Sequence, residues 1–344
     1  MKVRTLAQSL VMVAAALALL AVLPVSGQSA ETVKLKMADS FPTSHYVVSQ
    51  AAKPWMDRVV QLSKTKVEFQ YFPSEQLGKQ SDMVNLLRTG VAEVVYTSPT
   101  GLSGDFPLHT FFFLPNLFGT CTEGTRIYQQ MLKEGPLLEE FTKKGARPLF
   151  LFTIPTYEIF TVKKAVVKME DVNGLKIRSS GGYMDTVVKA LGAVAVQIPA
   201  PDISTALQRG TVDGATFAYV SAISYRLEEQ VKYATLGARL SSSVPGYAIL
   251  EQTWQKLPAD VREAMTKASE EIVASATKWQ DDETMRIVST FEKAGVKINR
   301  LSKDEMARWE QTLAPLIEQW AKDMEAKGLA GKQVVDAYKK ATGR

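Results

Sequence analysis

Side chains that commonly carry out catalysis are scarce in this sequence of 344 residues. It contains two histidines, His45 and His109, and one cysteine, Cys121. A serine nucleophile needs a base beside it, and no Gly-x-Ser-x-Gly turn occurs anywhere in the chain. A zinc site needs His and Cys ligands clustered at short spacing, which these three isolated residues do not supply. We therefore predict neither nucleophilic catalysis nor a metal centre.

Motifs for other common chemistries are missing as well. Gly78-Lys79 lacks the upstream glycine of a phosphate-binding loop, and no Gly-x-Gly-x-x-Gly occurs to bind a dinucleotide. The neighbouring carboxylates Asp281 and Asp282 lie in a charged stretch with a helical pattern, which favours a solvated helix face over an acid/base pair. We expect no catalytic residue and no cofactor. The helices and strands of this chain are therefore expected to serve a function other than catalysis.

The first half of the chain alternates between strand and helix patterns. Hydrophobic residues at every second position predict strands, and hydrophobic residues three or four apart predict helices. The predicted elements are a strand at Thr32–Ala38, a helix at Ala51–Leu62, a strand at Val67–Phe72, a helix at Gln80–Arg88 and a strand at Val91–Tyr96. This order predicts an α/β lobe. The polar loop 97–107 follows the last strand, where open α/β sheets bind their ligands.

The second half repeats this alternation after the turn Asp171–Gly174. The predicted elements are a strand at Leu175–Arg178, a helix at Tyr183–Leu191, a strand at Val194–Ile198, a helix at Ile203–Arg209 and a strand at Val212–Phe217. They predict a second α/β lobe. A helical pattern then extends from Ala259 to Ala294, with one interruption at 280–284, and is long enough to lie across both lobes.

Composition agrees with two lobes and argues against several partners. A chain of 344 residues with 46% hydrophobic content buries a large core. The formal charge is +5, and removing the charges of Lys2 and Arg4 leaves +3. Because this surplus is small and spread along the chain, we expect neither nucleic acid nor an anionic membrane as a partner. A single cysteine also excludes an internal disulfide framework.

The N-terminus has the pattern of an export signal. Lys2 and Arg4 precede an apolar run from Leu10 to Val25 that is short for a membrane span. We interpret residues 1–30 as a signal peptide cleaved between Gly27 and Ala30, which predicts a periplasmic mature protein. An uncleaved membrane anchor is the alternative interpretation.

A set of motifs resembles the core signature of the TRAP (tripartite ATP-independent periplasmic) transporter solute-binding proteins. The match includes the order and the spacing, and extends over nearly the whole mature chain. In the second half the motifs are Gly174-Leu175-Lys176-Ile177-Arg178, Ala190-Leu191-Gly192-Ala193 and Ala206-Leu207-Gln208-Arg209-Gly210-Thr211-Val212-Asp213-Gly214. Further matches are Phe72-Pro73-Ser74-Glu75-Gln76-Leu77-Gly78, Arg88-Thr89-Gly90-Val91-Ala92-Glu93 and Trp254-Gln255-Lys256-Leu257-Pro258.

This resemblance implies a fold and a set of partners. The expected fold is α/β, with two lobes joined by crossing strands, a ligand cleft between them and a long helix spanning both. We assign 31–155 and 244–282 to lobe I, and 156–243 and 283–344 to lobe II. The implied function is a periplasmic binding protein that captures a small organic acid and delivers it to a small and a large membrane subunit for uptake driven by an ion gradient.

Within this resemblance, Arg178 matches the arginine that pairs with the ligand's carboxylate. A guanidinium offers a planar pair of donors that fits a carboxylate. Thr97 and Ser98 match ligand-contacting positions after the third strand, and their hydroxyl groups can form hydrogen bonds. Asp39 and Ser40 match another ligand-facing region, although an ordinary turn explains them equally well.

Two departures from relatives shape the expected ligand. Phe217 stands where some members have an asparagine, and Glu158 stands where sialic-acid-binding relatives have a second arginine. Together they predict a pocket for one anion, a monocarboxylate with an aromatic or other apolar body that can also carry a hydroxyl group. This body is expected to pack on Phe217 with Tyr157, Tyr183 or Tyr219 nearby. In that pocket Glu158 accepts a hydrogen bond from a ligand hydroxyl or amine. The alternative places Phe217 in the lobe core and Glu158 in solvent.

Two other functions stay open from the sequence. One is a periplasmic hydrolase or isomerase on the same scaffold, which the lack of a base or metal site disfavours. The other is a binding protein that serves a sensor kinase, which needs the same ligand site but no transport subunits.

Overall fold

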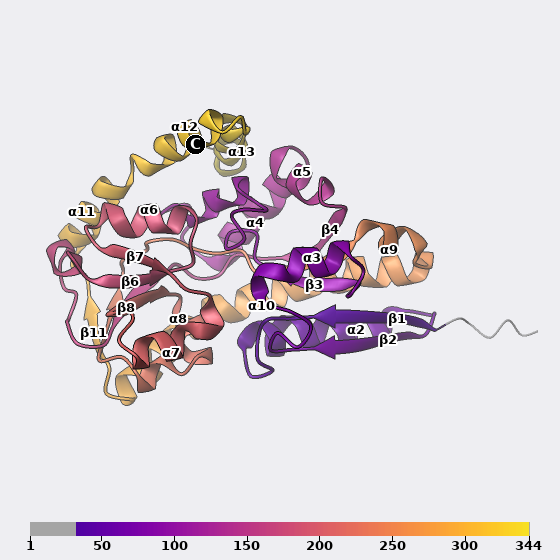
Figure 1. Cartoon of the computed structure of the whole chain (residues 1–344), viewed down its shortest axis with the longest axis horizontal. Helices are drawn as coiled ribbons and strands as arrows, with labels where there is room; N and C mark the ends of the chain where they lie inside the picture. The colour runs from indigo at the N-terminus through magenta and orange to yellow at the C-terminus, as the bar shows by residue number, and fades with distance from the viewer. Residues whose placement is uncertain (1–31, 344) are drawn as a thin grey trace, which may run out of the picture. The chain divides into compact units, whose positions relative to one another are not determined.

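Two β-sheets organise residues 32–343, the part of the chain that this computed structural model describes (Figure 1). The first sheet has the strand order β2-β1-β3-β10-β4, with β1 at Val33–Ala38, β2 at Val67–Phe72, β3 at Val94–Thr97, β4 at Ala146–Leu151 and β10 at Gly246–Leu250. The second sheet has the order β11-β9-β5-β8-β6-β7, with β5 at Glu158–Thr161, β6 at Lys176–Ser179, β7 at Val194–Gln197, β8 at Gly214–Phe217, β9 at Tyr233–Leu236 and β11 at Lys297–Arg300. Each sheet with its helices forms one lobe.

In the first sheet, β1 lies parallel to β2 and β3. Strand β10 lies between β3 and β4 and is antiparallel to both. It enters at Gly246, where a Cβ atom would lie 2.2 Å from the carbonyl oxygen of Phe150, so this close approach requires glycine. The helices associated with this lobe are η1 (Val48–Ala52), α2 (Lys53–Leu62), η2 (Gln80–Asp82), α3 (Met83–Arg88), η3 (Leu108–Phe113), α4 (Cys121–Leu132), α5 (Pro136–Thr142) and α9 (Glu251–Lys256).

The second sheet repeats the parallel pattern around β6, which lies parallel to β7 and β8. Strand β5 is antiparallel to β8 and β9, and β11 lies parallel to β9 at the edge. The helices of this region are η4 (Met169–Val172), α6 (Tyr183–Ala190), η5 (Ala200–Asp202), α7 (Ile203–Gln208), α8 (Tyr219–Ser224) and η6 (Leu227–Glu229). The predicted α/β fold with two lobes is confirmed.

Two extended segments, 152–157 and 238–245, connect the lobes side by side. Backbone hydrogen bonds join them from Phe152 to Pro245 (3.1 Å), from Ile154 to Ser243 (3.1 Å) and from Tyr157 to Ser241 (2.7 Å). These segments therefore form a narrow antiparallel connection between the two sheets.

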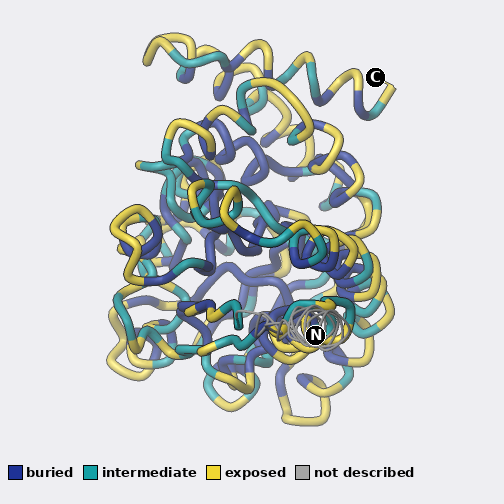
Figure 2. Tube along the Cα trace, turned by 90° about the vertical axis from the view of Figure 1, so that its right-hand side faces the viewer, coloured by how far each residue is buried: buried dark blue, intermediate teal, exposed yellow. Residues whose placement is uncertain are grey.

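Helix α10 (Ala259–Lys293) packs against elements of both lobes, as predicted from its length. It contacts α2, α4 and β4 on one side of the connection, and α8 and β11 on the other. Figure 2 shows buried chain (dark blue) running through the interior, with exposed chain (yellow) at turns and outer faces. The interruption at 280–284 has a structural cause, because the Asp281 carboxylate accepts hydrogen bonds from the backbone N–H groups of Cys121 (2.7 Å) and Thr122 (3.1 Å) at the start of α4. The expectation of a solvated face thus fits Asp282, which pairs with Lys278, but not Asp281.

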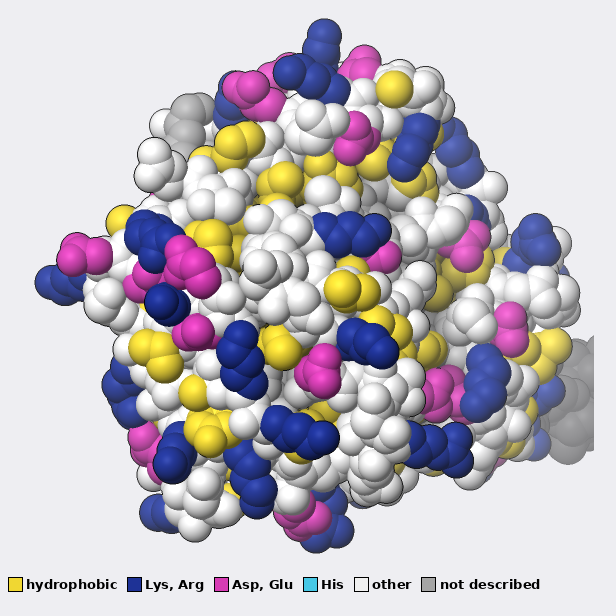
Figure 3. Space-filling view, turned by 60° about the vertical axis from the view of Figure 1, so that its left-hand side comes forward, with side chains coloured by type: hydrophobic (Ala, Val, Ile, Leu, Met, Phe, Trp, Pro, Cys, Tyr) yellow, Lys and Arg dark blue, Asp and Glu magenta, His cyan; other side chains and the backbone are white. Residues whose placement is uncertain are grey.

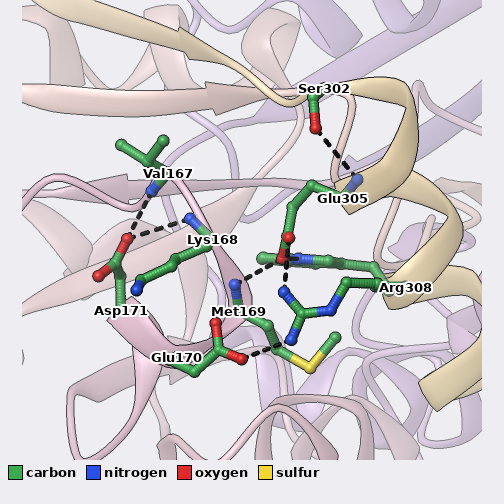
Figure 4. A network of polar contacts seen from close by, with 9 residues as sticks. Val167, Lys168, Met169, Glu170, Asp171, Ser302, Glu305 and Arg308 are labelled. Atoms are coloured by element: carbon green, nitrogen blue, oxygen red, sulfur yellow. Dashed lines mark hydrogen bonds and ion pairs between the residues drawn. The ribbon is translucent and has the colours of Figure 1, made fainter.

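The C-terminal helices are α11 (Lys303–Leu313), α12 (Leu316–Ala326) and α13 (Gly331–Thr342), and they divide between the lobes. Figure 4 shows how α11 attaches to η4: one Glu305 oxygen accepts from the Met169 N–H (2.7 Å), and Arg308 contacts both Glu305 and Glu170. In contrast, α13 packs against α4 and α5 of the first lobe. The expectation that all of 283–344 belongs to lobe II therefore fits β11 and α11, whereas α13 contacts lobe I.

The predicted signal peptide, 1–30, lies outside the described residues. Within residues 32–343, no helix combines the length and the apolar character needed to cross a membrane. On the face drawn in Figure 3, Lys and Arg side chains are interspersed with Asp and Glu side chains.

Candidate ligand-binding site

A cavity of about 140 Å³ lies between the two lobes, and we call it the Arg178 cavity. Both lobes contribute to its wall, and most of the side chains are aromatic or carry a hydroxyl group. Its polar and charged residues include His45, Ser98, Arg178, Tyr225 and Ser243. Arg178 is the one Lys or Arg among the described residues of this wall, and none of those residues is Asp or Glu.

Arg178 lies in β6, where its backbone pairs with Val196 of β7 and Ala215 of β8. Its side chain is only 2% exposed. Nε donates to the carbonyl oxygen of Ile198 (2.8 Å), and Nη1 donates to that of Thr216 (3.2 Å). Nη2 has no hydrogen-bond partner within residues 32–343, and no carboxylate there forms an ion pair with the guanidinium. Burial lowers the pKa of Arg178, yet an arginine stays charged at neutral pH.

The turn after β6 fixes the direction of this strand end. The backbone of Gly181 has φ 83°, and a Cβ atom there would lie 2.3 Å from the side-chain nitrogen of Gln197, which itself lines the cavity. Ser179 contacts Asp185 in the first turn of α6, and its Oγ accepts from the Gly181 N–H (3.2 Å). The glycine-rich sequence after Arg178 is therefore a requirement of this close-packed turn.

Aromatic rings cover one side of the guanidinium. Its carbon lies 4.2 Å from the centre of the Phe217 ring, a cation–π contact. Tyr157 lies roughly parallel to Phe217, with ring centres 6.3 Å apart. Both residues line the cavity, so the structure brings Arg178, Phe217 and Tyr157 together as the sequence predicted.

Ser98 also lines the cavity, at the end of β3. Its hydroxyl lies 3.4 Å from those of Thr100 and Ser243, which are themselves 2.8 Å apart. Thr97, one residue earlier, points away: it is buried, outside the cavity wall, and its hydroxyl has no partner within the described residues. Because side chains alternate along a strand, only one of these two neighbours can face the cavity.

Asp39 and Ser40 do not line the cavity, which corrects the expectation from the sequence. The Asp39 carboxylate accepts from the Phe41 N–H (2.9 Å), from the Tyr71 hydroxyl (2.8 Å) and from the Tyr247 hydroxyl, so it joins β1 to β2 and β10. Burial raises the pKa of Asp39 to about 6. Ser40 is buried beside it, and its hydroxyl has no partner within residues 32–343. The turn interpretation, which the sequence left open, fits both residues.

Glu158 is a second correction, because its carboxylate faces away from the Arg178 cavity. It accepts from the Thr235 hydroxyl (2.7 Å) and from the N–H groups of Gly237 (3.0 Å) and Ala238 (3.0 Å). It lines a separate cavity of about 380 Å³, the Glu158 cavity, together with Tyr219, Arg239 and Asp281. It is therefore neither the ligand acceptor nor the solvated residue of the two sequence interpretations.

The other two predicted tyrosines also lie outside the Arg178 cavity. Tyr219 lines the Glu158 cavity, and its hydroxyl donates a hydrogen bond to the carbonyl oxygen of Thr235 (2.8 Å). Tyr183 begins α6, and its hydroxyl lies 3.4 Å from the carbonyl oxygen of Leu316. Neither ring is available to a ligand held by Arg178.

Most residues of the cavity wall are not predicted from the sequence, His45 and Tyr225 among them. In the sequence, His45 has no partner that would make it a base or a metal ligand. Tyr225 follows α8 and belongs to no motif. A signal for His45 exists in hindsight, because it follows closely on the loop after the first strand, the same strand end that suggested Asp39 and Ser40.

The arrangement can bind an anion, but the described residues offer no base positioned for proton transfer. Burial lowers the pKa of His45 to about 3, so its ring is neutral. His109 is occupied by Glu140, 2.8 Å away, and lies outside the cavity. Within residues 32–343, no group of His, Cys, Asp and Glu could hold a metal ion.

Comparison with known proteins gives one family and several relatives. Residues 37–323 match the family model of the bacterial extracellular solute-binding proteins, family 7. The C4-dicarboxylate-binding periplasmic protein DctP of Rhodobacter capsulatus is 27% identical over 280 residues, covering 79% of this chain and 81% of the relative.

Two solved structures resemble this fold closely. A TRAP solute-binding protein from Rhodoferax ferrireducens with copurified benzoate has a TM-score of 0.83 and 23% identity, and the match covers 90% of this chain and 97% of the other. A marine metagenome TRAP solute-binding protein specific for aromatic acid ligands, with 3-hydroxybenzoate, has a TM-score of 0.83 and 23% identity over 90% and 98% of the two chains.

Proposed function

We propose a function that starts from one established fact: this chain belongs to the family of TRAP solute-binding proteins. The family consists of binding proteins rather than enzymes. We infer that this member captures a small monocarboxylate with an aromatic or other apolar body. It then delivers the ligand to the small and large membrane subunits of a transporter.

The observation that carries this proposal is the buried, unpaired charge of Arg178. A charged group removed from water costs several kcal/mol unless an opposite charge and hydrogen bonds compensate it. Two backbone carbonyl groups and one aromatic face supply part of that compensation. A ligand carboxylate supplies the missing anion and accepts from Nη2, in the geometry that a guanidinium favours.

Charge and size together support one carboxylate on a small ring. The cavity wall offers one guanidinium, and His45 is neutral, so a second ligand carboxylate would find no cation among the described residues. An apolar cavity of about 150 Å³ is known to hold a benzene molecule, and the cavity here measures about 140 Å³. Phe217 and Tyr157 provide flat apolar surfaces for such a ring. Similar proteins with benzoate or 3-hydroxybenzoate bound support the same ligand class.

Delivery to a transporter requires export, and the predicted signal peptide of residues 1–30 supports a periplasmic location. The family membership supports the membrane subunits as partners. The sensor function that the sequence left open uses the same ligand site, and no described feature favours it.

Ligand identity is tested by two measurements on the mature protein. Mass spectrometry of material released by denaturation identifies any copurified acid. Thermal unfolding is then followed with benzoate, succinate and N-acetylneuraminate, because a ligand at 100 times its Kd stabilises the folded state by about 2.7 kcal/mol. We expect benzoate to raise the midpoint and the other two to leave it unchanged. A strong shift with succinate and none with benzoate would overturn the proposal of an aromatic monocarboxylate.

A further inference from the structure

The wall of the Arg178 cavity contains buried polar atoms without a partner within residues 32–343. These atoms are Nε2 of His45, the hydroxyl oxygen of Tyr225 and Oε1 of Gln80. Gln80 is only half-buried, and its amide can turn towards water. His45 and Tyr225 are much more deeply buried, at 1% and 9% exposed. Other hydroxyl groups of the wall do have neighbours, as Ser98 and Ser243 show.

The hydrogen-bonding role of His45 follows from its other ring nitrogen. The backbone N–H of Val47 donates to Nδ1 (3.2 Å), so Nδ1 is an acceptor and carries no proton. In a neutral imidazole the proton must then lie on Nε2. The ring is held in place by stacking on Phe41, with centres 3.8 Å apart and planes 4° apart. Nε2 is therefore a fixed donor whose proton has no acceptor among the described residues.

Tyr225 brings a second polar atom to the same part of the wall from the opposite lobe. Its ring centre lies 5.2 Å from that of His45 and 5.8 Å from that of Phe217. Phe217 is thus the neighbour that Tyr225 and Arg178 share, since the guanidinium carbon lies 4.2 Å from the same ring. A ligand held by its carboxylate at Arg178 extends along Phe217 towards the His45 and Tyr225 side chains.

We propose that His45 and Tyr225 form a second polar subsite, which binds a hydroxyl oxygen carried on the ligand's ring. Nε2–H of His45 donates a hydrogen bond to that oxygen, and the Tyr225 hydroxyl oxygen accepts a hydrogen bond from the ligand's O–H. The preferred ligand class is then a hydroxylated aromatic monocarboxylate. This inference rests on the proposed function, because the carboxylate at Arg178 is what places the ring.

Burial explains why this subsite discriminates between ligands. A ligand without the hydroxyl leaves both buried groups unsatisfied, which is more costly than the net gain of an ordinary hydrogen bond. A site built to bind a hydroxyl therefore rejects the analogue that lacks it. In this proposal, His45 and Tyr225 form the hydrogen bond to the ligand hydroxyl that the sequence had predicted for Glu158.

The experiment compares matched ligands on the intact mature protein by calorimetry. Benzoate, 3-hydroxybenzoate and 4-hydroxybenzoate are titrated into the wild type, Tyr225→Phe and His45→Asn. Asparagine keeps an acceptor for the Val47 N–H, as in an Asx turn, and removes the Nε2 donor. We expect one hydroxybenzoate to bind the wild type about tenfold more tightly than benzoate, and each variant to reduce that preference to about threefold or less.

Tyr128→Phe is the matched control, because the Tyr128 hydroxyl is also buried and without a partner in the described residues but lies outside the cavity. It should keep the full preference for the hydroxylated ligand. If all three acids bind the wild type equally, or if Tyr225→Phe and His45→Asn both keep the preference, the subsite is refuted and the proposed function stands. If none of the acids binds the wild type, both the subsite and the aromatic-acid function are refuted.

Discussion

The Arg178 cavity and the Glu158 cavity each contain one charged side chain that the sequence singled out, and the two cavities differ in how those charges are satisfied. Both side chains belong to the second sheet and both are at most 4% exposed. Glu158 accepts three hydrogen bonds from its own lobe. Arg178 keeps one guanidinium nitrogen without an acceptor and has no anion within residues 32–343.

From this difference we infer that Glu158 is a structural charge, and we propose Arg178 as a ligand-binding one. A buried charge whose hydrogen bonds are complete holds the fold together, and a ligand has nothing to add to it. A buried charge with an unused hydrogen-bond donor and no counter-ion is stabilised by a ligand that supplies the acceptor and the opposite charge. The comparison predicts that substitutions in the two cavities will affect two different quantities, the affinity and the stability.

The largest effect is expected for Arg178→Met, which removes the charge and keeps most of the volume beside Phe217. Affinity for the aromatic acid should fall by about thirty- to several-thousand-fold, corresponding to about 2–5 kcal/mol. Stability without ligand should stay equal or rise, because an unpaired buried charge disappears. Calorimetry and urea unfolding measure the two quantities. If the folded variant kept its ligand affinity, the proposed difference in function between the Arg178 cavity and the Glu158 cavity would be wrong.

Glu158→Gln is expected to show the opposite pattern. Its new amide N–H groups would face N–H donors of Gly237 or Ala238, so the free energy of unfolding should fall by about 2–3 kcal/mol. Ligand affinity should change less than about threefold. Glu170→Gln is a control on an exposed carboxylate paired with Arg308, and it should leave the free energy of unfolding nearly unchanged. An affinity loss in Glu158→Gln that matches Arg178→Met would contradict this assignment.

The smallest effect concerns the neutral state of His45. Its folded pKa, lowered to about 3, lies below the unfolded value of 6.5, so the stability it contributes above pH 6.5 is lost as the pH falls towards 3. Between pH 6.5 and pH 5, this loss is about 2 kcal/mol. Asp39 acts in the opposite sense, because its pKa is raised to about 6, and its protonation favours the folded state as the pH falls.

The contribution of His45 is isolated by comparing unfolding of the wild type and His45→Asn at each pH. The difference in their free energies of unfolding should change by about 2 kcal/mol across that interval, with the variant losing less. A constant difference would show that His45 is not held neutral.

Sequence patterns predicted the fold well because hydrophobic periodicity is a local property. Strand β6 and helix α6 lie within one residue of their predicted bounds, and α10 ends one residue earlier than expected. The placement of residues on regular strands followed too, since Arg178, the penultimate residue of β6, and Phe217, the last of β8, both line the cavity.

Residues at irregular ends could not be assigned from the sequence. Whether Thr97 or Ser98 faces the ligand depends on the register of β3. Asp39 is satisfied by tyrosines far away in sequence, and Glu158 by a loop 79 residues later. Such pairings form only in the folded chain, so the sequence identified these carboxylates without revealing their partners.

The position of β10 between β3 and β4 has a consequence for the order in which the chain folds. Strand β10, an interior strand of the first sheet, is made almost a hundred residues after its neighbour β4, once the second sheet's β5 to β9 have passed. Until Gly246–Leu250 is synthesised, the facing edges of β3 and β4 are unpaired and the first sheet is incomplete. A nascent chain therefore cannot complete the first sheet until late in synthesis.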